Sequence, residues 1–144
     1  MRGFRLRAVV MGEKPSGEGG AAALPRVLVV ADLADRLAQL GKLLSAVPAD
    51  GVPTATCDAA RYAARTLGPF EVVIADADLA DGDGVKLAAE LKRTHGCRTL
   101  IVSRNDGPAT DAGGPNLPDG IDLWIANPVR LSALRKAIRA LRQP

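Results

Sequence analysis

Two aspartates stand directly after short apolar runs and carry the clearest chemical signal in this chain. Asp32 ends the segment RVLVVAD, and Asp76 ends the segment EVVIAD. Short β-branched runs bounded by polar residues and separated by a helical pattern are typical of buried parallel strands. Open α/β sheets bind ligands at the carboxyl ends of their strands, near the point where the strand order reverses. The sequence therefore predicts two acids at one functional sheet edge.

The elements that must position these acids follow from the alternation of strand-like and helix-like segments, which is typical of a doubly wound sheet. The expected strands are the runs before Asp32 and Asp76 and residues 52–56, 99–103 and 121–126. The expected helices are residues 33–47, a helix capped by Asp58 and reaching about Thr66, a helix opened by Asp83-Gly84, and residues 131–141 with an apolar stripe of leucine and isoleucine.

The alternation of strand-like and helix-like segments is interrupted between Arg104 and Gly120. This segment contains NDGP and GGPNLP, which break secondary structure where an α/β protein would place its fourth helix. We expect a loop or at most one turn there.

Size and composition bound the remaining alternatives. The 144 residues suit one domain, with 1–24 as a flexible N-terminal extension and 25–144 as the folded part. No apolar stretch approaches the roughly 18 residues needed to cross a bilayer, so we expect a cytoplasmic protein with no membrane partner. Cys57 and Cys97 lack metal-site or disulfide spacing, which favours reduced thiols.

The charge pattern gives little support to nucleic-acid binding. The net charge is only +3, and aromatic residues, which could stack on bases, make up 3% of the chain. The last helix carries several basic residues away from its apolar stripe. A solvated face is the default explanation, and a docking surface for an acidic partner is the sharper one.

Four segments together resemble a known family. DADLADGDG (residues 76–84) begins with Asp76, LIVS ends at Ser103, and WIANP contains Trp124 and Asn127. With the strand before Asp32, they resemble the receiver domain of two-component response regulators. The resemblance covers residues 26–144 and implies the flavodoxin-like (CheY-like) fold, a doubly wound five-stranded parallel sheet, here with its fourth helix degraded to a loop.

The resemblance also implies roles for individual residues. Asp76 would be the phospho-acceptor and a Mg²⁺ ligand, Asp32 a second ligand, and the backbone carbonyl of Asp78 a third. Ser103 would be the switch hydroxyl that donates to a phosphoryl oxygen, and Trp124 the switch aromatic that then turns inward. Without the resemblance, a half-buried packing residue is the better interpretation of Trp124, and with it the two interpretations are about equal. Neutralising charge on the phosphoryl oxygens is what such a transfer requires.

Departures from the family pattern point to weakened switching. The first acid of the usual pair is Ala31, and Asn127 replaces the lysine that pairs with the phosphoryl group. Losing a charge-assisted hydrogen bond of roughly 1.5 to 3 kcal/mol would weaken the coupling about tenfold to a hundredfold. Asp78 could supply the missing carboxylate, and Arg104 the missing cation, although each also reads as a solvated loop residue.

One peptide bond near the switch has two interpretations. The bond between Asn127 and Pro128 would be cis by resemblance. Alternatively, it is an ordinary trans bond before a proline that opens the last helix.

We therefore expect a stand-alone atypical receiver that is not an enzyme. It would act through contacts with a histidine kinase, a phosphotransferase or a downstream effector, with Mg²⁺ bound weakly. Two alternatives stay open: a phosphorylation-independent pseudo-receiver, and a sensor of a small anion or nucleotide. An enzyme of another kind is disfavoured, because the chain has one histidine and no glycine-rich phosphate loop after a strand.

Overall fold

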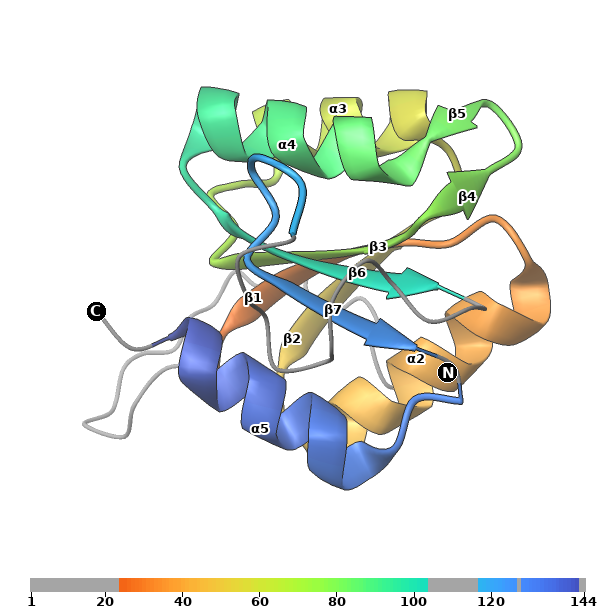
Figure 1. Cartoon of the computed structure of the whole chain (residues 1–144), viewed down its shortest axis with the longest axis vertical. Coiled ribbons are helices and arrows are strands. Elements are labelled where there is room, and N and C mark those ends of the chain that lie inside the picture. The colour runs from red at the N-terminus through yellow and green to blue at the C-terminus, as the bar shows by residue number, and fades with distance from the viewer. Residues whose placement is uncertain (1–23, 104–116, 127, 143–144) are drawn as a thin grey trace.

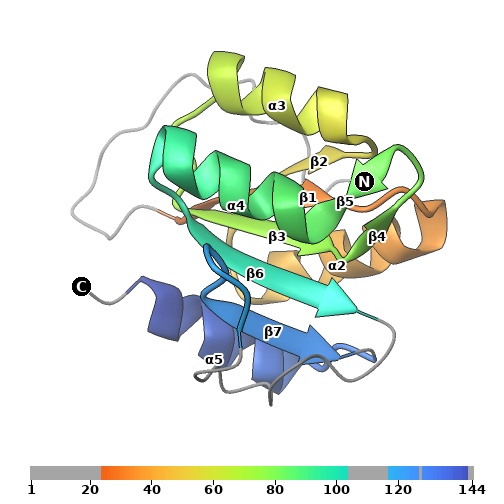
Figure 2. The same ribbon diagram turned by 45° about the horizontal axis from the view of Figure 1, so that its top comes forward.

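The computed structural model describes residues 24–103, 117–126 and 128–142. Within these ranges, a five-stranded parallel sheet has the order β2-β1-β3-β6-β7. Its strands are β1 (Arg26–Val30), β2 (Asp50–Thr54), β3 (Val72–Asp76), β6 (Arg98–Ser103) and β7 (Leu123–Ala126). Figure 2 shows the arrowheads of β3, β6 and β7 pointing the same way. The predicted doubly wound sheet is confirmed.

Helices cover both faces of this sheet (Figure 1). One face carries α3 (Cys57–Thr66) and α4 (Gly84–His95), and the other carries α2 (Ala34–Ala46) and α5 (Leu131–Leu141). Because side chains alternate along a strand, each strand contributes side chains to the cores on both faces of the sheet. In β3, Val73 and Ala75 join the core beneath α3 and α4, whereas Val72 and Ile74 join the core beneath α2 and α5. This alternation decides which way each functional side chain points.

Local sequence signals explain where the helices begin. Asp83 caps α4, because its carboxylate accepts the backbone N–H of Val85 at 2.8 Å. For α3 the prediction was wrong: the cap is Thr56, whose hydroxyl accepts the backbone N–H of Ala59, and Asp58 lies inside the first turn. Any early threonine or aspartate is a plausible cap, so the choice between them depends on where the preceding strand ends.

Two strands also differ from their predicted bounds. Strand β2 begins at Asp50 and ends at Thr54, two residues earlier than expected, because it pairs with β1 from Arg26↔Asp50 to Val30↔Thr54. Pro53 is tolerated because β2 lies at the edge of the sheet. The fifth strand starts at Leu123 and not at Ile121. A short antiparallel pair that the sequence did not indicate, β4 (Asp78–Leu79) with β5 (Gly82–Asp83), follows β3.

Glycine is required where α4 begins against the end of β3. A Cβ added to Gly84 would lie 1.7 Å from the backbone oxygen of Asp76, much closer than any real carbon approaches an oxygen. The Asp-Gly pair therefore lets the first turn of α4 pack directly on the backbone that carries Asp76.

Several predictions lie outside the described residues: the flexible extension, apart from Leu24, the loop in place of the fourth helix, and the bond between Asn127 and Pro128. In the described ranges, no helix has the length and apolar character to span a bilayer. Cys57 and Cys97 are buried free thiols. Burial raises the pKa of Cys57 to about 11, helped by the nearby Asp81 carboxylate.

Candidate functional site

Asp76 is the last residue of β3 and lies at the carboxyl end of the sheet, as predicted. It is only 3% exposed. Its side chain has the same strand parity as Val72 and Ile74, which pack beneath α2. The carboxylate therefore lies on the α2 side of the sheet edge, near the turn where β1 passes into α2.

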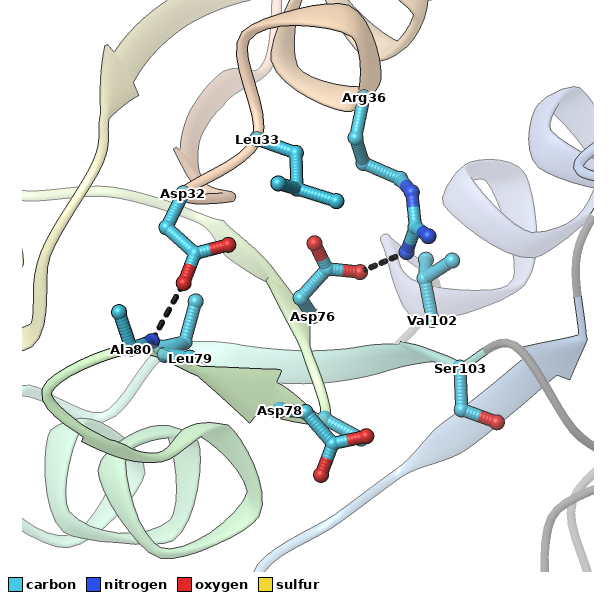
Figure 3. Close-up of a pocket in the computed structure, with 10 residues that line it drawn as sticks. Asp32, Leu33, Arg36, Asp76, Asp78, Leu79, Ala80, Val102 and Ser103 are labelled. Atoms are coloured by element: carbon cyan, nitrogen blue, oxygen red, sulfur yellow. Dashed lines mark hydrogen bonds and ion pairs between the residues drawn. The ribbon is translucent and has the colours of Figure 1, made fainter.

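Arg36 in the first turn of α2 reaches this carboxylate. Its Nη1 lies 2.5 Å from Oδ1 of Asp76, and the exposed side-chain fractions are 17% for Arg36 and 4% for Asp76. Figure 3 shows the guanidinium group directed at the carboxylate across the mouth of the pocket. A permanently charged group thus neutralises Asp76 directly.

Asp32 follows β1 and lies at the same edge, also as predicted. Its Oδ2 accepts a hydrogen bond from the backbone N–H of Ala80, which joins the end of the first strand to the loop after Asp76. Ala31, at the position of the missing family acid, is fully buried in the core beneath α2 and α5. No carboxylate other than Asp32 could therefore come from this end of β1.

Asp78 does not complete a set of three acids. It is exposed and starts the short strand β4, and in Figure 3 its carboxylate lies away from the space between Asp32 and Asp76. The described residues contain no cluster of three His, Cys, Asp or Glu side chains able to hold a metal ion. The hypothesis that the Asp78 carboxylate replaces the missing acid is thus not supported, while its backbone carbonyl as a ligand stays a prediction.

The donor set does not suit Mg²⁺ in this arrangement. Mg²⁺ requires close octahedral coordination by oxygen. Here one oxygen of Asp76 is hydrogen-bonded to a cation and one oxygen of Asp32 to a backbone amide. A divalent ion at Asp76 would also lie beside the like-charged guanidinium group of Arg36.

Ser103 and Trp124 meet on the other side of the sheet edge. Ser103 ends β6, one residue beyond the Asp76↔Val102 pair, so its side chain points toward the α4 layer. Nε1 of Trp124 donates a hydrogen bond to Oγ of Ser103 at 3.1 Å. Trp124 is 9% exposed and packs in the core beneath α3 and α4. The two predicted switch residues are therefore in direct contact, with the indole ring directed inward.

Two cavities flank this edge and share Ser103. A cavity of about 310 Å³ contains Asp32, Arg36 and Asp76 in its lining, and one of about 470 Å³ lies between Trp124, Asp83 and Ser103. Ala77 and Asp78 also line both cavities. A change at Asp76 could thus be transmitted to Trp124 through Ser103 and the backbone of residues 76–78.

The loop after Asp76 is anchored at its far end by Asp81. Both oxygens of its carboxylate accept the backbone N–H of Cys57, at 3.0 and 3.1 Å. This hydrogen bond lowers the pKa of Asp81, so the anchor stays charged at neutral pH. It fixes the start of α3 to the loop after Asp76.

Two predicted site residues, Arg104 and Asn127, lie outside the described residues. One residue that the sequence analysis did not single out is Arg36. A signal was present, since a cation in the first turn of a helix opposes the helix dipole and therefore calls for a nearby acid.

Comparisons with known proteins agree on the fold. No family model and no curated protein matches the chain. A CheY-like receiver domain from Methylobacillus flagellatus superposes with a TM-score of 0.68 at 16% identity, covering 83% of this chain and 100% of that one. A CheY-like receiver domain protein from Methanospirillum hungatei gives 0.70 at 21% identity, covering 82% and 93%.

A two-component response regulator from Clostridium difficile also gives a TM-score of 0.70, at 17% identity, with 81% of this chain and 94% of that one covered. Together with the strand order β2-β1-β3-β6-β7, these matches show that the chain has the CheY-like receiver fold.

Proposed function

We propose that this protein is an atypical receiver module of two-component signalling that acts through protein-protein contacts, with Asp76 as its phospho-acceptor. One observation carries this proposal. A buried carboxylate lies at the carboxyl end of the central strand β3, beside a cavity that it shares with Asp32 and Ser103. A carboxylate in that position can act as a nucleophile toward phosphorus.

The proposed transfer is chemically simple. An oxygen of the Asp76 carboxylate forms a bond to the phosphorus of the donor, and the bond between phosphorus and the donor's leaving atom breaks. The electron pair leaves with the donor, as acetate when the donor is acetyl phosphate and as imidazole, after gaining a proton, when it is a phosphohistidine. The guanidinium group of Arg36 can donate to the phosphoryl oxygens.

The proposed readout runs through Ser103 and Trp124. If Ser103 turns its hydroxyl toward a phosphoryl oxygen, it breaks the hydrogen bond from the Trp124 indole. The indole N–H must then find another acceptor or move the ring, because leaving a buried donor unpaired costs about 1 to 3 kcal/mol. Phosphorylation would therefore shift the packing of Trp124 and of the cavity beside Asp83.

Mg²⁺ has a small part in this proposal. We propose that the chain binds it weakly, since Ala31 removes one ligand and Arg36 competes for the carboxylate of Asp76. The partners are proposed from the fold: a histidine kinase or phosphotransferase as donor, and a downstream effector as reader.

A second candidate is a phosphorylation-independent interaction module. The ion pair between Arg36 and Asp76 supports it, because the acceptor is already neutralised, and so does the inward position of Trp124. A sensor of a free anion is less well supported, because three aspartates line the cavity beside Arg36.

Intact mass after incubation with acetyl phosphate distinguishes the two candidates. Parent protein and Asp76→Asn are compared, with and without Mg²⁺, while Trp124 fluorescence is followed. We expect one phosphoryl adduct on the parent and none on Asp76→Asn, together with a fluorescence change only in the parent.

Asp35→Asn is a matched control, because Asp35 is an exposed acid in the first turn of α2 and does not line the cavity. An adduct on both the parent and Asp76→Asn would place the acceptor elsewhere. No adduct on any variant would favour the phosphorylation-independent module.

A further inference from the structure

We propose that Arg36 is a built-in cation that takes the place of a divalent metal at Asp76 and is the main reason why Mg²⁺ binds there only weakly. This inference goes beyond the proposed function. It concerns which cation neutralises the carboxylate, and it holds or fails whether or not Asp76 accepts a phosphoryl group.

The contact itself is close and sheltered from water. Nη1 of Arg36 lies 2.5 Å from Oδ1 of Asp76, with side-chain exposures of 17% and 4%. Charges that are partly buried interact more strongly and are screened less by salt than surface charges. A guanidinium group does not lose its proton in proteins, so this cation is present at every physiological pH.

The architecture delivers Arg36 to Asp76. Asp76 has the strand parity of Val72 and Ile74, whose side chains pack in the core beneath α2. Helix α2 begins at Ala34, just after β1, which is the direct neighbour of β3 in the sheet. The third residue of the helix therefore lies above the end of β3, and its long side chain reaches the carboxylate.

The other oxygen groups near Asp76 do not compensate for the positive charge of Arg36 in attracting a divalent ion. The neighbouring acid of the family pattern is replaced by Ala31, which is fully buried. Asp32 gives one of its oxygens to the backbone N–H of Ala80, and Asp78 is exposed on β4. Among the described residues that line the cavity, three aspartates, of which Asp78 is exposed, stand against one guanidinium group. This attracts a divalent ion less strongly than the carboxylates alone would.

The loss of an acid at Ala31 and the presence of Arg36 both weaken Mg²⁺ binding. Mg²⁺ dehydrates reluctantly and needs several oxygen ligands at about 2.0 to 2.1 Å. To bind at Asp76 it would have to displace the guanidinium group and leave that group in a half-buried position beside a divalent ion. The like charges would repel strongly at this separation.

The test is direct titration of the full chain with MgCl₂, followed by calorimetry and by Trp124 fluorescence in chelator-treated buffer. The variants are Arg36→Gln and Arg36→Met, two neutral replacements of similar length. The matched control is Arg61→Gln, which removes the same charge from an ion pair with Glu90 on the α3 and α4 side, away from the cavity.

We expect the parent and Arg61→Gln to bind Mg²⁺ equally and only weakly, with half-saturation at high millimolar concentration. Both Arg36 variants should bind Mg²⁺ at least about tenfold more tightly, which corresponds to about 1.4 kcal/mol. Adding Asp32→Asn to Arg36→Gln should abolish the gained binding, since it removes the second carboxylate.

Two results would overturn the inference: binding by the parent as tight as that by the Arg36 variants, or no binding by any of them. If Arg36→Gln is unfolded without metal, recovery of its folded near-UV spectrum on adding Mg²⁺ supports the inference, and no recovery overturns it. Failure of Asp76 to accept a phosphoryl group would affect none of these measurements, so the two proposals fail separately.

Discussion

The buried ion pair between Arg36 and Asp76 dominates the site at the scale of single residues. Taking both charges out of water is costly, and their attraction offsets that cost only while both partners are present. Because the side chain of Asp76 is only 4% exposed and that of Arg36 17%, removing either residue takes a charged partner away from the other. Each residue therefore depends on its partner for stability as well as for chemistry.

A double-mutant cycle should show this dependence. In Mg²⁺-free buffer we expect Arg36→Gln to lower the free energy of unfolding by up to about 3 to 5 kcal/mol, because it removes a cation that is paired with a buried carboxylate. Asp76→Asn should cost less, since Arg36 can turn toward water. The double variant should be more stable than the sum of the two changes predicts, as measured by urea unfolding.

The comparison pair is Arg61 and Glu90, whose side chains are 38% and 37% exposed. A surface pair of this kind contributes less than about 1 kcal/mol, so the same cycle there should give little coupling. Additive effects at Arg36 and Asp76 would contradict the structural interpretation.

At the scale of secondary-structure elements, the close packing of α4 on the end of β3 positions residues 77–83, which join the two. The first residue of α4, Gly84, has no room for a side chain above the Asp76 backbone. Gly96 ends the same helix with φ of 77°, in the left-handed region that favours glycine for a different reason. Glycine is therefore needed at Gly84 because a side chain would clash, and at Gly96 because of the backbone conformation.

Replacing each glycine with alanine should give unequal losses. Gly96→Ala has open space around the new Cβ and should cost about 1 to 2 kcal/mol through backbone strain alone. Gly84→Ala must push α4 away from β3 and should cost about 3 kcal/mol or more. Urea unfolding measures both, and a smaller loss at Gly84 than at Gly96 would show that the helix shifts without cost.

At the scale of the whole molecule, the described residues form a five-stranded sheet between two helical layers, and one half-buried acid, Asp122, joins several of its parts. Asp122 accepts hydrogen bonds from Nζ of Lys92 on α4 and from the backbone N–H of Thr99 on β6, both at 2.9 Å. Burial alone would raise the pKa of Asp122. The bonds from Lys92 and Thr99 outweigh burial and lower this pKa below its ordinary 3.8.

Acid should therefore destabilise the fold partly through Asp122. A carboxyl whose pKa is lower in the folded state contributes its full stability above pH 3.8 and loses it as the pH falls through the folded value. We expect Asp122→Asn to lower the free energy of unfolding by about 1 to 2 kcal/mol at neutral pH. The difference in stability from the parent should shrink as the pH falls below 3.8. Urea midpoints across pH measure this, and a constant difference would contradict it.

Most of the fold could be predicted from local patterns, because the apolar periodicities of 2 and 3.6 residues follow from backbone geometry. Where the prediction was wrong, non-local pairing decided. The register with β1 moves β2 back to Asp50 and Gly51, two residues that are disfavoured in strands. The β4–β5 pair is too short to leave a periodic pattern.

For the site, the sequence alone predicts that Asp32, Asp76 and Ser103 lie at or just after the carboxyl ends of strands and that Trp124 lies in the last strand, because parallel strands bring their carboxyl ends to one edge. Only the tertiary structure decided that Arg36 pairs with Asp76 and that Trp124 donates to Ser103. The physical reason is strand parity. One residue of offset at the end of a strand selects which helical layer a side chain faces, and therefore which partner, 40 or 21 residues away in sequence, it contacts.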